Sequence, residues 1–426
     1  MSINDTTAGT ASIGIEELRA RHARDYNPYN PVSFEEHLAE MAERRREMPV
    51  SFSPRNGCWV LTRYDDASSV LRRSGRGVVS FPNNPDGAND TGAAEGMIPV
   101  EIDGPRHRQF RALLDPFFSP ERVALLEDGL REWANRLIDG WIEDGRCDFV
   151  DGFALPFPGI TVLTIMGWPF EDLRRMNTWV GYLLHGVSGG TVEETNAARA
   201  QAHGEMREYM LALIADRRVS APRDDVTGAA LLAEVDGSKL TDLELFDLFL
   251  TMTLAGLDTV QSVLAQSMAY LAQHPDQWDR MFETPESLEP AIEELLRWCA
   301  PATPTRTVVA DELEVGGVVL PKGERVHTPL IAVNRDPKYF EEPDEVRFDR
   351  QARPHLAFAL GAHRCVGVHL ARLELKIAFT ELRRRLPSFR LVDGVEPHEI
   401  IGLTYTVDNV HLAFTPGQKE VTDSLA

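Results

Sequence analysis

One cysteine, Cys365, stands in a context that would activate its sulfur. It follows a loop containing Gly361, and the apolar residues after it, Leu370, Leu373 and Ile377, have the spacing of an amphipathic helix. This predicts that the sulfur lies at a helix N-terminus, where backbone donors and the helix dipole stabilise a thiolate, the form of cysteine that binds metals. A lone cysteine is more often buried and inert, so the neighbouring sequence must decide between the two interpretations.

Polar residues also interrupt a long apolar stretch, at Asp258 and Thr259 in the string Ala255-Gly-Leu-Asp-Thr259. Such side chains cost free energy inside a buried helix unless they are satisfied locally or used. One interpretation is a helix kink, with the Thr259 hydroxyl bonded to a carbonyl. The other is proton delivery by positioned side chains, an ordinary form of general acid catalysis.

The elements that must hold these residues follow from the hydrophobic pattern. Thr241 and Glu244 have the spacing of a capping box, and the apolar stretch after them predicts a helix over residues 241–272. At roughly 1.5 Å per residue it would be about 50 Å long, and its nearly continuous apolar surface would place it in the core. Helical patterns dominate residues 105–300, and strand patterns lie at 59–64, 307–318, 325–330 and 404–414. We expect a mainly α protein with a minor β region.

Composition excludes several classes of protein. The 426 residues carry a net charge of −22, which disfavours nucleic-acid binding because phosphates would be repelled. The four cysteines form no CxxC pair, so we expect neither a disulfide framework nor a structural zinc site. The first thirty residues contain no apolar block, which predicts a cytoplasmic protein without a signal peptide or membrane anchor. Residues 1–15 are expected to form a flexible tail and residues 16–426 a single domain.

The cysteine loop reads His355-Leu-Ala-Phe358-Ala-Leu-Gly361-Ala-His363-Arg364-Cys365-Val-Gly-Val-His-Leu-Ala-Arg372, and over these eighteen positions it resembles the haem-binding loop of the cytochrome P450 family. The resemblance implies the cytochrome P450 fold and haem b, lying between the long central helix and the helix after the loop. It makes Cys365 the axial ligand of the iron, with Phe358, Gly361 and Ala255 against the cofactor. The family usually has Gly where this chain has Ala359, a change that should alter loop packing rather than ligation.

Four basic side chains resemble the family's partners for the haem propionates. His107 and Arg111 are four residues apart and share one helix face, where charge-assisted bonds to a carboxylate can form. Arg306 and His363 resemble two further donors. Each of the four, taken singly, could equally be a solvated surface charge.

Two more pairs acquire roles from the resemblance. Glu294 and Arg297 resemble the E-x-x-R element, a structural pair beneath the haem, whereas most i,i+3 pairs are exposed and contribute little. In the long helix, Thr259 would contact bound dioxygen and Asp258 would relay protons toward it.

The resemblance predicts a monooxygenase that inserts one oxygen atom from O2 into a small hydrophobic organic substrate, by hydroxylation or demethylation. Residues 256–264 and the surroundings of Phe110 are most similar to the monoterpene-hydroxylating members. By analogy, the pocket draws on residues 81–98 and 180–192, and six residues are predicted to contact the substrate: Thr251, Leu254, Ala255, Thr303, Leu403 and Thr404. These positions are apolar or small and carry no charge, which favours a compact hydrophobic substrate.

Electrons should come from separate proteins, a ferredoxin or flavodoxin with its reductase, because no such segment is fused to the chain. Such donors are acidic, so a local basic face is expected. The protein is expected to be a monomer. The candidates for that face are Arg108, Arg364, Arg372 and Lys376, unless these are ordinary solvated charges.

Three other functions compete with the monooxygenase. The first is peroxide-driven chemistry on the same scaffold, which would not need Asp258 and Thr259 because peroxide supplies both electrons and protons. The second is a haem-thiolate sensor or binding protein without catalysis. The third is a helical protein without haem, which requires the whole cysteine loop to be coincidence.

Overall fold

The computed structural model describes residues 14–26, 33–75, 77–80, 97–351, 353–402 and 404–421. Helix α11 (Asp242–Gln273), at 32 residues, is the longest of the described elements. Thr241 caps it, because its hydroxyl accepts the Glu244 N–H at 3.2 Å and the Glu244 carboxylate accepts the Thr241 N–H at 2.7 Å. The helix predicted over residues 241–272 is therefore confirmed to within one residue at each end.

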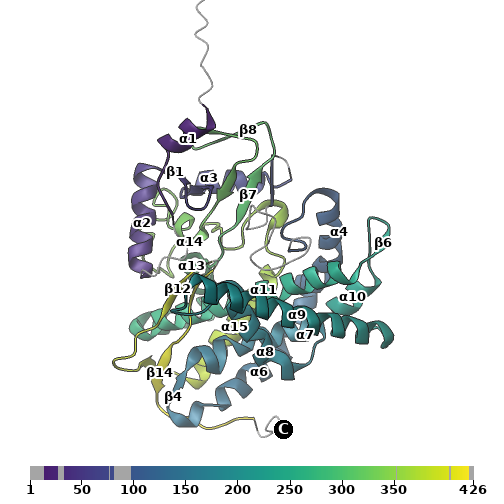
Figure 1. Cartoon of the computed structure of the whole chain (residues 1–426). Coiled ribbons are helices and arrows are strands. Elements are labelled where there is room, and N and C mark those ends of the chain that lie inside the picture. Colours follow the sequence, from purple (N-terminus) through teal and green to yellow (C-terminus); the bar gives the residue numbers. More distant parts are fainter. Residues whose placement is uncertain are drawn as a thin grey trace, which may run out of the picture.

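Helix α11 crosses the middle of the molecule in Figure 1, between a part that carries the larger sheet and a part built mainly of helices. Its length and composition would suffice to cross a membrane, but 83% of its apolar window is buried inside the protein. Its first half, to Leu257, shares one apolar cluster with α4 (Gly104–Leu114), α7 (Pro156–Met166), α8 (Leu173–His185) and α9 (Val192–Val219). Its second half, from Val260, shares another with α6 (Glu127–Asp139), α13 (Leu288–Cys299) and α15 (Val368–Arg385). Asp258 and Thr259 therefore lie where two apolar clusters meet.

Most of the helices around α11 come from residues 104–219, and α13 and α15 come from later in the chain. The others are α1 (Ile15–Arg21), α2 (Phe34–Glu47), α3 (Tyr64–Arg72), α5 (Pro120–Ala124), α10 (Val226–Leu232), α12 (Pro275–Arg280) and α14 (Leu330–Val333), with short 3-10 or π turns at η1 (Asp115–Phe118), η2 (Ile142–Asp144), η3 (Val150–Ala154), η4 (Phe170–Asp172) and η5 (Gly361–His363).

The larger sheet has five strands in the order β1 (Val50–Ser53), β2 (Cys58–Leu61), β10 (Arg325–His327), β7 (Thr305–Val308) and β3 (Val78–Ser80). Strands β2 and β10 are parallel, and the other neighbours are antiparallel. Along β7, burial alternates, so that Arg306 and Val308 face inward. This alternation turns Arg306 toward the interior of the protein.

Smaller sheets complete the β region. They comprise β11 (Phe389–Leu391), β14 (His411–Phe414) and β4 (Arg146–Asp148) in one, and the pairs β12 (Glu399–Ile401) with β13 (Tyr405–Val407), β8 (Glu312–Val315) with β9 (Val318–Pro321), and β5 (Glu234–Val235) with β6 (Ser238–Lys239). The mainly α architecture with a minor β region is confirmed. The strand predicted to residue 330 ends at His327, since Pro329 has no N–H for a ladder and instead precedes α14.

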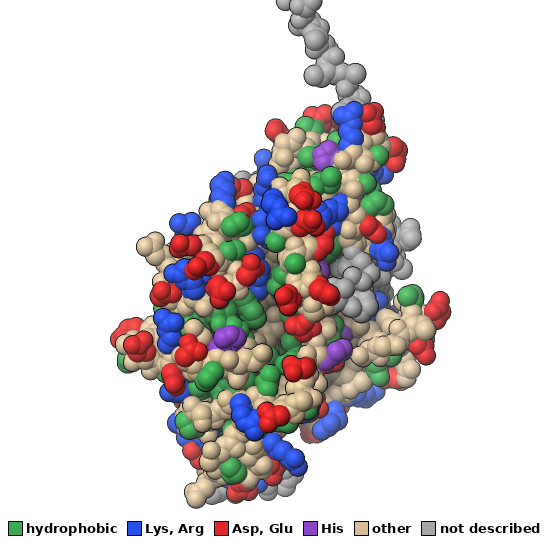
Figure 2. Space-filling view, turned by 90° about the vertical axis from the view of Figure 1, so that its left-hand side faces the viewer, with side chains coloured by type: hydrophobic (Ala, Val, Ile, Leu, Met, Phe, Trp, Pro, Cys, Tyr) green, Lys and Arg blue, Asp and Glu red, His purple; other side chains and the backbone are tan. Residues whose placement is uncertain are grey.

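Residues 1–13 lie outside the described part of the chain, so the tail predicted over residues 1–15 stays a prediction, although α1 already begins at Ile15. Figure 2 shows acidic and basic side chains interspersed over one face rather than gathered by sign. The net charge of −22 is thus not concentrated in one patch of that face.

Candidate active site

A cavity of about 410 Å³ lies between α11, α7, β7 and the cysteine loop. Volumes of this size are typical of sites for small molecules. The predicted site residues that line it are His107, Arg111, Thr251, Leu254, Ala255, Thr259, Thr303, Thr404, Arg306, Phe358, His363 and Cys365. Asp258 and Gly361 are not among the lining residues, and Leu403 lies outside the described residues. Residues from segments far apart in the sequence therefore converge on one cavity.

The cysteine loop is closed by backbone hydrogen bonds around Cys365. Its N–H donates to the Phe358 carbonyl at 3.0 Å, and α15 begins three residues after it, at Val368. Gly361 has a φ of +76°, and a Cβ there would come 2.5 Å from the carbonyl oxygen of Leu71. This glycine lets the loop pack against α3, whereas the sequence had suggested an approach to a flat ligand.

Ala359 takes a φ of +51° in the same loop, the left-handed region where a Cβ is unfavourable. Its N–H donates to the Leu356 carbonyl at 2.8 Å, which holds the turn in place. The departure from the family's usual glycine therefore adds local backbone strain to the loop.

The sulfur of Cys365 opens onto the cavity rather than onto bulk solvent. Its depth in the fold raises the pKa of the Cys365 thiol, while the Gly367 N–H and the charges of Arg111, Arg364 and Arg372 act in the opposite direction. Burial also raises the pKa of the other thiols, to about 11 for Cys58 and about 12 for Cys147 and Cys299.

The four predicted propionate partners gather on one side of the cavity. Arg306 is 4% exposed, and it donates to the Ser74 hydroxyl at 3.0 Å and to the Thr305 carbonyl at 2.7 Å. Among the described residues no carboxylate forms an ion pair with it. A buried guanidinium is costly without an anionic partner, so this position suits the carboxylate of a ligand.

The other three members are partly engaged within the protein. Arg111 is paired with Asp115 at 2.9 Å, and its Nη1 donates to the Arg364 carbonyl at 2.7 Å. The His363 ring lies 4.2 Å from the His107 ring, centroid to centroid, and its Nε2 is 2.9 Å from an oxygen of Asp103. Burial, with help from His363 and Arg111, lowers the pKa of His107 to about 4, so His107 is a neutral hydrogen-bonding group.

In α11, the Thr259 hydroxyl donates to the Ala255 carbonyl at 2.9 Å. This is the bond to a carbonyl that is expected if the motif only kinks the helix, yet Thr259 and Ala255 also line the cavity. Gly256 packs against α7, where a Cβ would come 2.4 Å from Val162 Cγ2. The glycine thus brings α11 and α7 together at the level of the cavity.

Asp258 is buried behind the cavity wall and has a partner that the sequence did not suggest. Its Oδ1 lies 2.7 Å from Nε2 of His185, the last residue of α8. The two residues are 73 positions apart, and neither has a flanking motif that predicts the contact.

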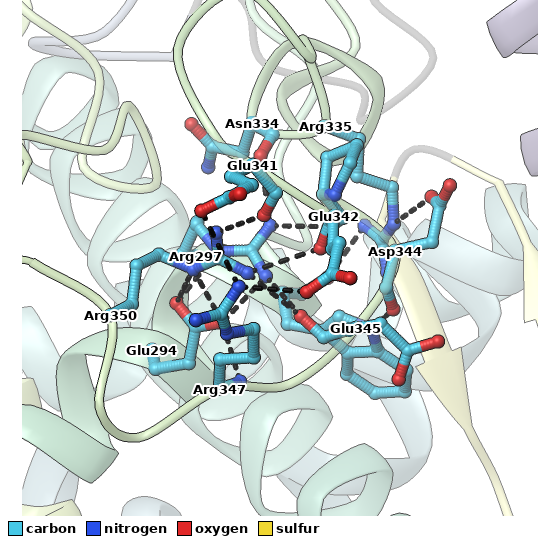
Figure 3. A network of polar contacts seen from close by, with 12 residues as sticks. Glu294, Arg297, Asn334, Arg335, Glu341, Glu342, Asp344, Glu345, Arg347 and Arg350 are labelled. Atoms are coloured by element: carbon cyan, nitrogen blue, oxygen red, sulfur yellow. Dashed lines mark hydrogen bonds and ion pairs between the residues drawn. The ribbon is translucent and has the colours of Figure 1, made fainter.

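Glu294 and Arg297 form the buried pair that the resemblance implied, and not an exposed one (Figure 3). Arg297 Nε and Nη2 donate to the two Glu294 oxygens at 2.8 and 2.7 Å, and Arg350 Nε donates to the same carboxylate at 3.0 Å. Arg297 also donates to three backbone carbonyls, those of Asn334, Pro343 and Glu345. The pair therefore fastens α13 to the segment before the cysteine loop.

Sequence reasoning missed several residues of the substrate side of the cavity. They are Pro99, Val100, Glu101, Leu114, Phe118, Val162, Ile165, Met166 and Glu374. Met97 also lines the cavity and belongs to the predicted segment 81–98, of which residues 81–96 lie outside the described part of the chain. From the predicted segment 180–192, Leu184 is the contributor. Two carboxyl groups, Glu101 and Glu374, also line the cavity outside the six predicted substrate positions, and burial raises the pKa of Glu374 to about 8.

Two of the four cations proposed for a docking face are paired within the protein. Arg372 binds Glu293 through two bonds of 2.6 and 2.7 Å, and Lys376 lies 3.0 Å from Glu289. Arg108 and Arg364 are exposed, and no described carboxylate forms an ion pair with either.

These residues fit a haem. Among the described residues no group of three or more His, Cys, Asp or Glu side chains could hold a bare metal ion. A single cysteine at the cavity wall suits an iron whose other ligands come from a macrocycle, and the buried Arg306 suits a carboxylate of that macrocycle. Fold and cavity together define a helical haem-thiolate protein.

Comparisons with known proteins agree. A model of the family described as cytochrome P450 matches residues 181–401. The methyl-branched lipid omega-hydroxylase of Mycobacterium tuberculosis is 32% identical over 376 residues, covering 84% of this chain and 86% of that protein. The polyketide biosynthesis cytochrome P450 PksS of Bacillus subtilis is 30% identical over 387 residues, covering 89% and 93%. The solved structure of CYP109E1 from Bacillus megaterium in complex with testosterone is 26% identical, with a TM-score of 0.81, and covers 91% of this chain and 98% of that one.

The chain belongs to the cytochrome P450 family, and its fold is the cytochrome P450 fold. Its cofactor is haem b, iron protoporphyrin IX with an axial cysteine thiolate. It is a monooxygenase, which acts on an organic substrate with O2 and electrons from redox partner proteins.

Proposed function

We propose that this monooxygenase inserts one oxygen atom from O2 into a small hydrophobic substrate held beside the haem in this cavity. The observation that carries the proposal is that Cys365, Thr259 and an apolar wall of α11 and α7 face the same space. The haem, when bound, supplies the activation of O2, and its thiolate ligand favours cleavage of the O–O bond. In this proposal Cys365 holds the iron, while Phe358 and Ala255 lie against the macrocycle.

The basic side chains orient the cofactor. Arg306 offers a buried guanidinium for one carboxylate, and burial lowers its pKa to about 10, which leaves it charged at neutral pH. Arg111 and His363 reach the same cavity from α4 and from the cysteine loop, and His107 adds a neutral donor. A charge-assisted bond has a stricter geometry than an apolar contact, so these side chains fix the rotational orientation of the cofactor in the cavity.

Proton handling falls to α11. Thr259 holds a proton at Oγ1 on the cavity wall, and Asp258 stands next to it in the chain as an acid that is buried and bonded to His185. Peroxide-driven chemistry has no need of such a pair, and this favours the O2-dependent reaction. The surrounding apolar side chains exclude water, which would otherwise compete for protons.

The substrate side is apolar in the parts contributed by Leu254, Val162 and Ile165. Thr251 Oγ1 donates its proton to the Asp247 carbonyl at 2.9 Å, so Thr251 can offer a substrate only a hydrogen-bond acceptor. Thr404 Oγ1 is buried and has no hydrogen-bond partner among the described residues, and it is the polar handle we propose for a substrate oxygen. A compact, terpenoid-like molecule with one oxygen satisfies these features.

The electron donor is proposed to be a ferredoxin or flavodoxin with its reductase, docking near Arg108 and Arg364. Reduced protein with carbon monoxide should show the strongly red-shifted Soret band of a thiolate-bound haem. Product should form with reductant, reductase and donor protein, and faster than with peroxide alone. A higher rate with peroxide would overturn the O2-dependent proposal.

Substrate class is tested by the spin-state shift of the haem on titration with monoterpenes, steroids and branched fatty acids. We expect the largest affinity for monoterpenes. Tighter binding of steroids or fatty acids would overturn the terpenoid class and leave the monooxygenase reaction in place.

A further inference from the structure

His185 connects the acid of α11 to the end of α8. Its Nε2 is 2.7 Å from Asp258 Oδ1, and the two side chains are 14% and 5% exposed. The other polar atom of each, His185 Nδ1 and Asp258 Oδ2, is buried without a hydrogen-bond partner among the described residues. Each residue thus has one polar atom committed to the other and one buried polar atom without a partner.

Electrostatics favour the protonated form of His185. Burial alone would lower its pKa, but the charge and hydrogen bond of Asp258 outweigh burial, and the pKa of His185 is raised above its ordinary value. His185 is also the last residue of α8, where the helix dipole stabilises a cation.

Charged groups on the neighbouring elements act on His185 in both directions. Asp408, after β13, raises its pKa, and Arg199 of α9 lowers it. Helix α7, which also packs on α8, contains no titratable residue, and the acids of η4 precede the first residue of α8, at its opposite end. The direct partner Asp258 therefore dominates.

We propose that His185 is the positioning residue of Asp258 and the group that returns protons to it. The inference rests on the proposed role of Asp258 in proton delivery. In the transfer, the Nε2–H bond of the imidazolium breaks and an O–H bond forms at Asp258 Oδ1. This leaves a neutral imidazole and a neutral carboxyl group, and a hydronium ion from the solvent then protonates the imidazole again and leaves as water. Helices α8 and α11 then form the proton-delivery element together.

The first test measures the protonation of His185 directly, in the diamagnetic reduced carbon monoxide complex of the holoenzyme. A ¹⁵N-histidine NMR titration should show a His185 pKa above 6.5, and Asp258→Asn should lower it. A His185 pKa at or below 6.5 in the unmodified protein would overturn the proposal.

The second test is His185→Gln, whose amide can still donate to Asp258 but cannot carry an exchangeable extra proton. Haem content and the affinity for a spin-shifting substrate should stay within about two-fold. Product formed per electron pair should fall at least about ten-fold, since positioned proton donors contribute on the order of 10²–10⁴ in rate. The pH dependence of product formed per electron pair that results from the titration of His185 should disappear.

A matched control is His274→Gln, because His274 is exposed and its Nδ1 lies 2.9 Å from the Tyr270 carbonyl, away from Asp258 and Asp408. It should leave coupling unchanged. If Asp258→Asn uncouples the reaction and His185→Gln does not, the proposed role of His185 is wrong and the role of Asp258 stands. Unchanged coupling in Asp258→Asn would show instead that the proposed proton route through α11 is wrong.

Discussion

Arg297 and Glu294, one turn apart on α13, form a two-bond ion pair with side chains only 2% and 5% exposed. Because Arg350 shares the same carboxylate, Glu294→Gln leaves two guanidinium groups buried without their anion. We expect a loss of about 3–5 kcal/mol in the free energy of unfolding, measured by urea denaturation of the holoprotein.

The matched control for that loss is an exposed pair of the same spacing, Arg390 and Asp393, at 2.9 Å. Asp393→Asn should cost less than about 1 kcal/mol. Equal losses in the two variants would contradict a structural role for the buried pair.

Replacing Ala359 with glycine should stabilise the folded protein. A left-handed residue with a Cβ destabilises the folded state by roughly 1–2 kcal/mol. Glycine has greater freedom in the unfolded chain, which offsets about 0.4–1 kcal/mol of the stabilisation gained by removing the Cβ. Ala359→Gly should therefore stabilise the protein by about 0.5–1 kcal/mol in the same assay. Ala362, in η5, lies outside the residues with positive φ, so Ala362→Gly should destabilise instead.

Cys365→Ser should remove the red-shifted Soret band of the reduced carbon monoxide complex, because a serine hydroxyl is not a thiolate. Cys147→Ser, in β4 and away from the cavity, should retain the band. A thiolate-type band in Cys365→Ser would assign the iron ligand to another residue.

Thr259→Ala should uncouple the reaction, with reductant consumed and peroxide released in place of product. The control is Thr253, whose hydroxyl makes the same kind of bond, to the Phe249 carbonyl at 2.8 Å, but which does not line the cavity. Thr253→Ala should keep the ratio of product to reductant. Matching ratios in the two variants would mean that the helix geometry, rather than a hydroxyl in the cavity, controls coupling.

Glu374 should make stability depend on pH. Burial raises the pKa of its carboxyl to about 8, against a weaker lowering by the Thr161 hydroxyl. The folded state then binds more protons than the unfolded state between about pH 4.5 and 8, so stability falls as pH rises through this window, by up to about 1.4 kcal/mol per pH unit.

Glu374→Gln should remove that slope, as measured by urea denaturation at several pH values between 5 and 8. Glu289→Gln is the control, because this side chain on α13 is 74% exposed. A slope that persists in Glu374→Gln would show that other groups cause it.

Much of the fold and the site could be predicted from the sequence, because the signals were local. The capping box of Thr241 and Glu244 and the apolar stretch after it lie within one element, so α11 follows from neighbouring residues. The cysteine loop and the start of α15 likewise depend on residues within a few positions of Cys365. The single domain over residues 16–426 and the role of Leu403 stay predictions.

Only the tertiary structure decided which distant side chains meet. It paired His185 with Asp258, set Arg306 beside Ser74, brought Arg350 to Glu294 and turned Glu374 into the cavity. The physical reason is that the state of a polar group depends on its burial and on its partner. Both are set by how α8, α11, α13, β7 and α15 pack, and not by the residues on either side in the chain.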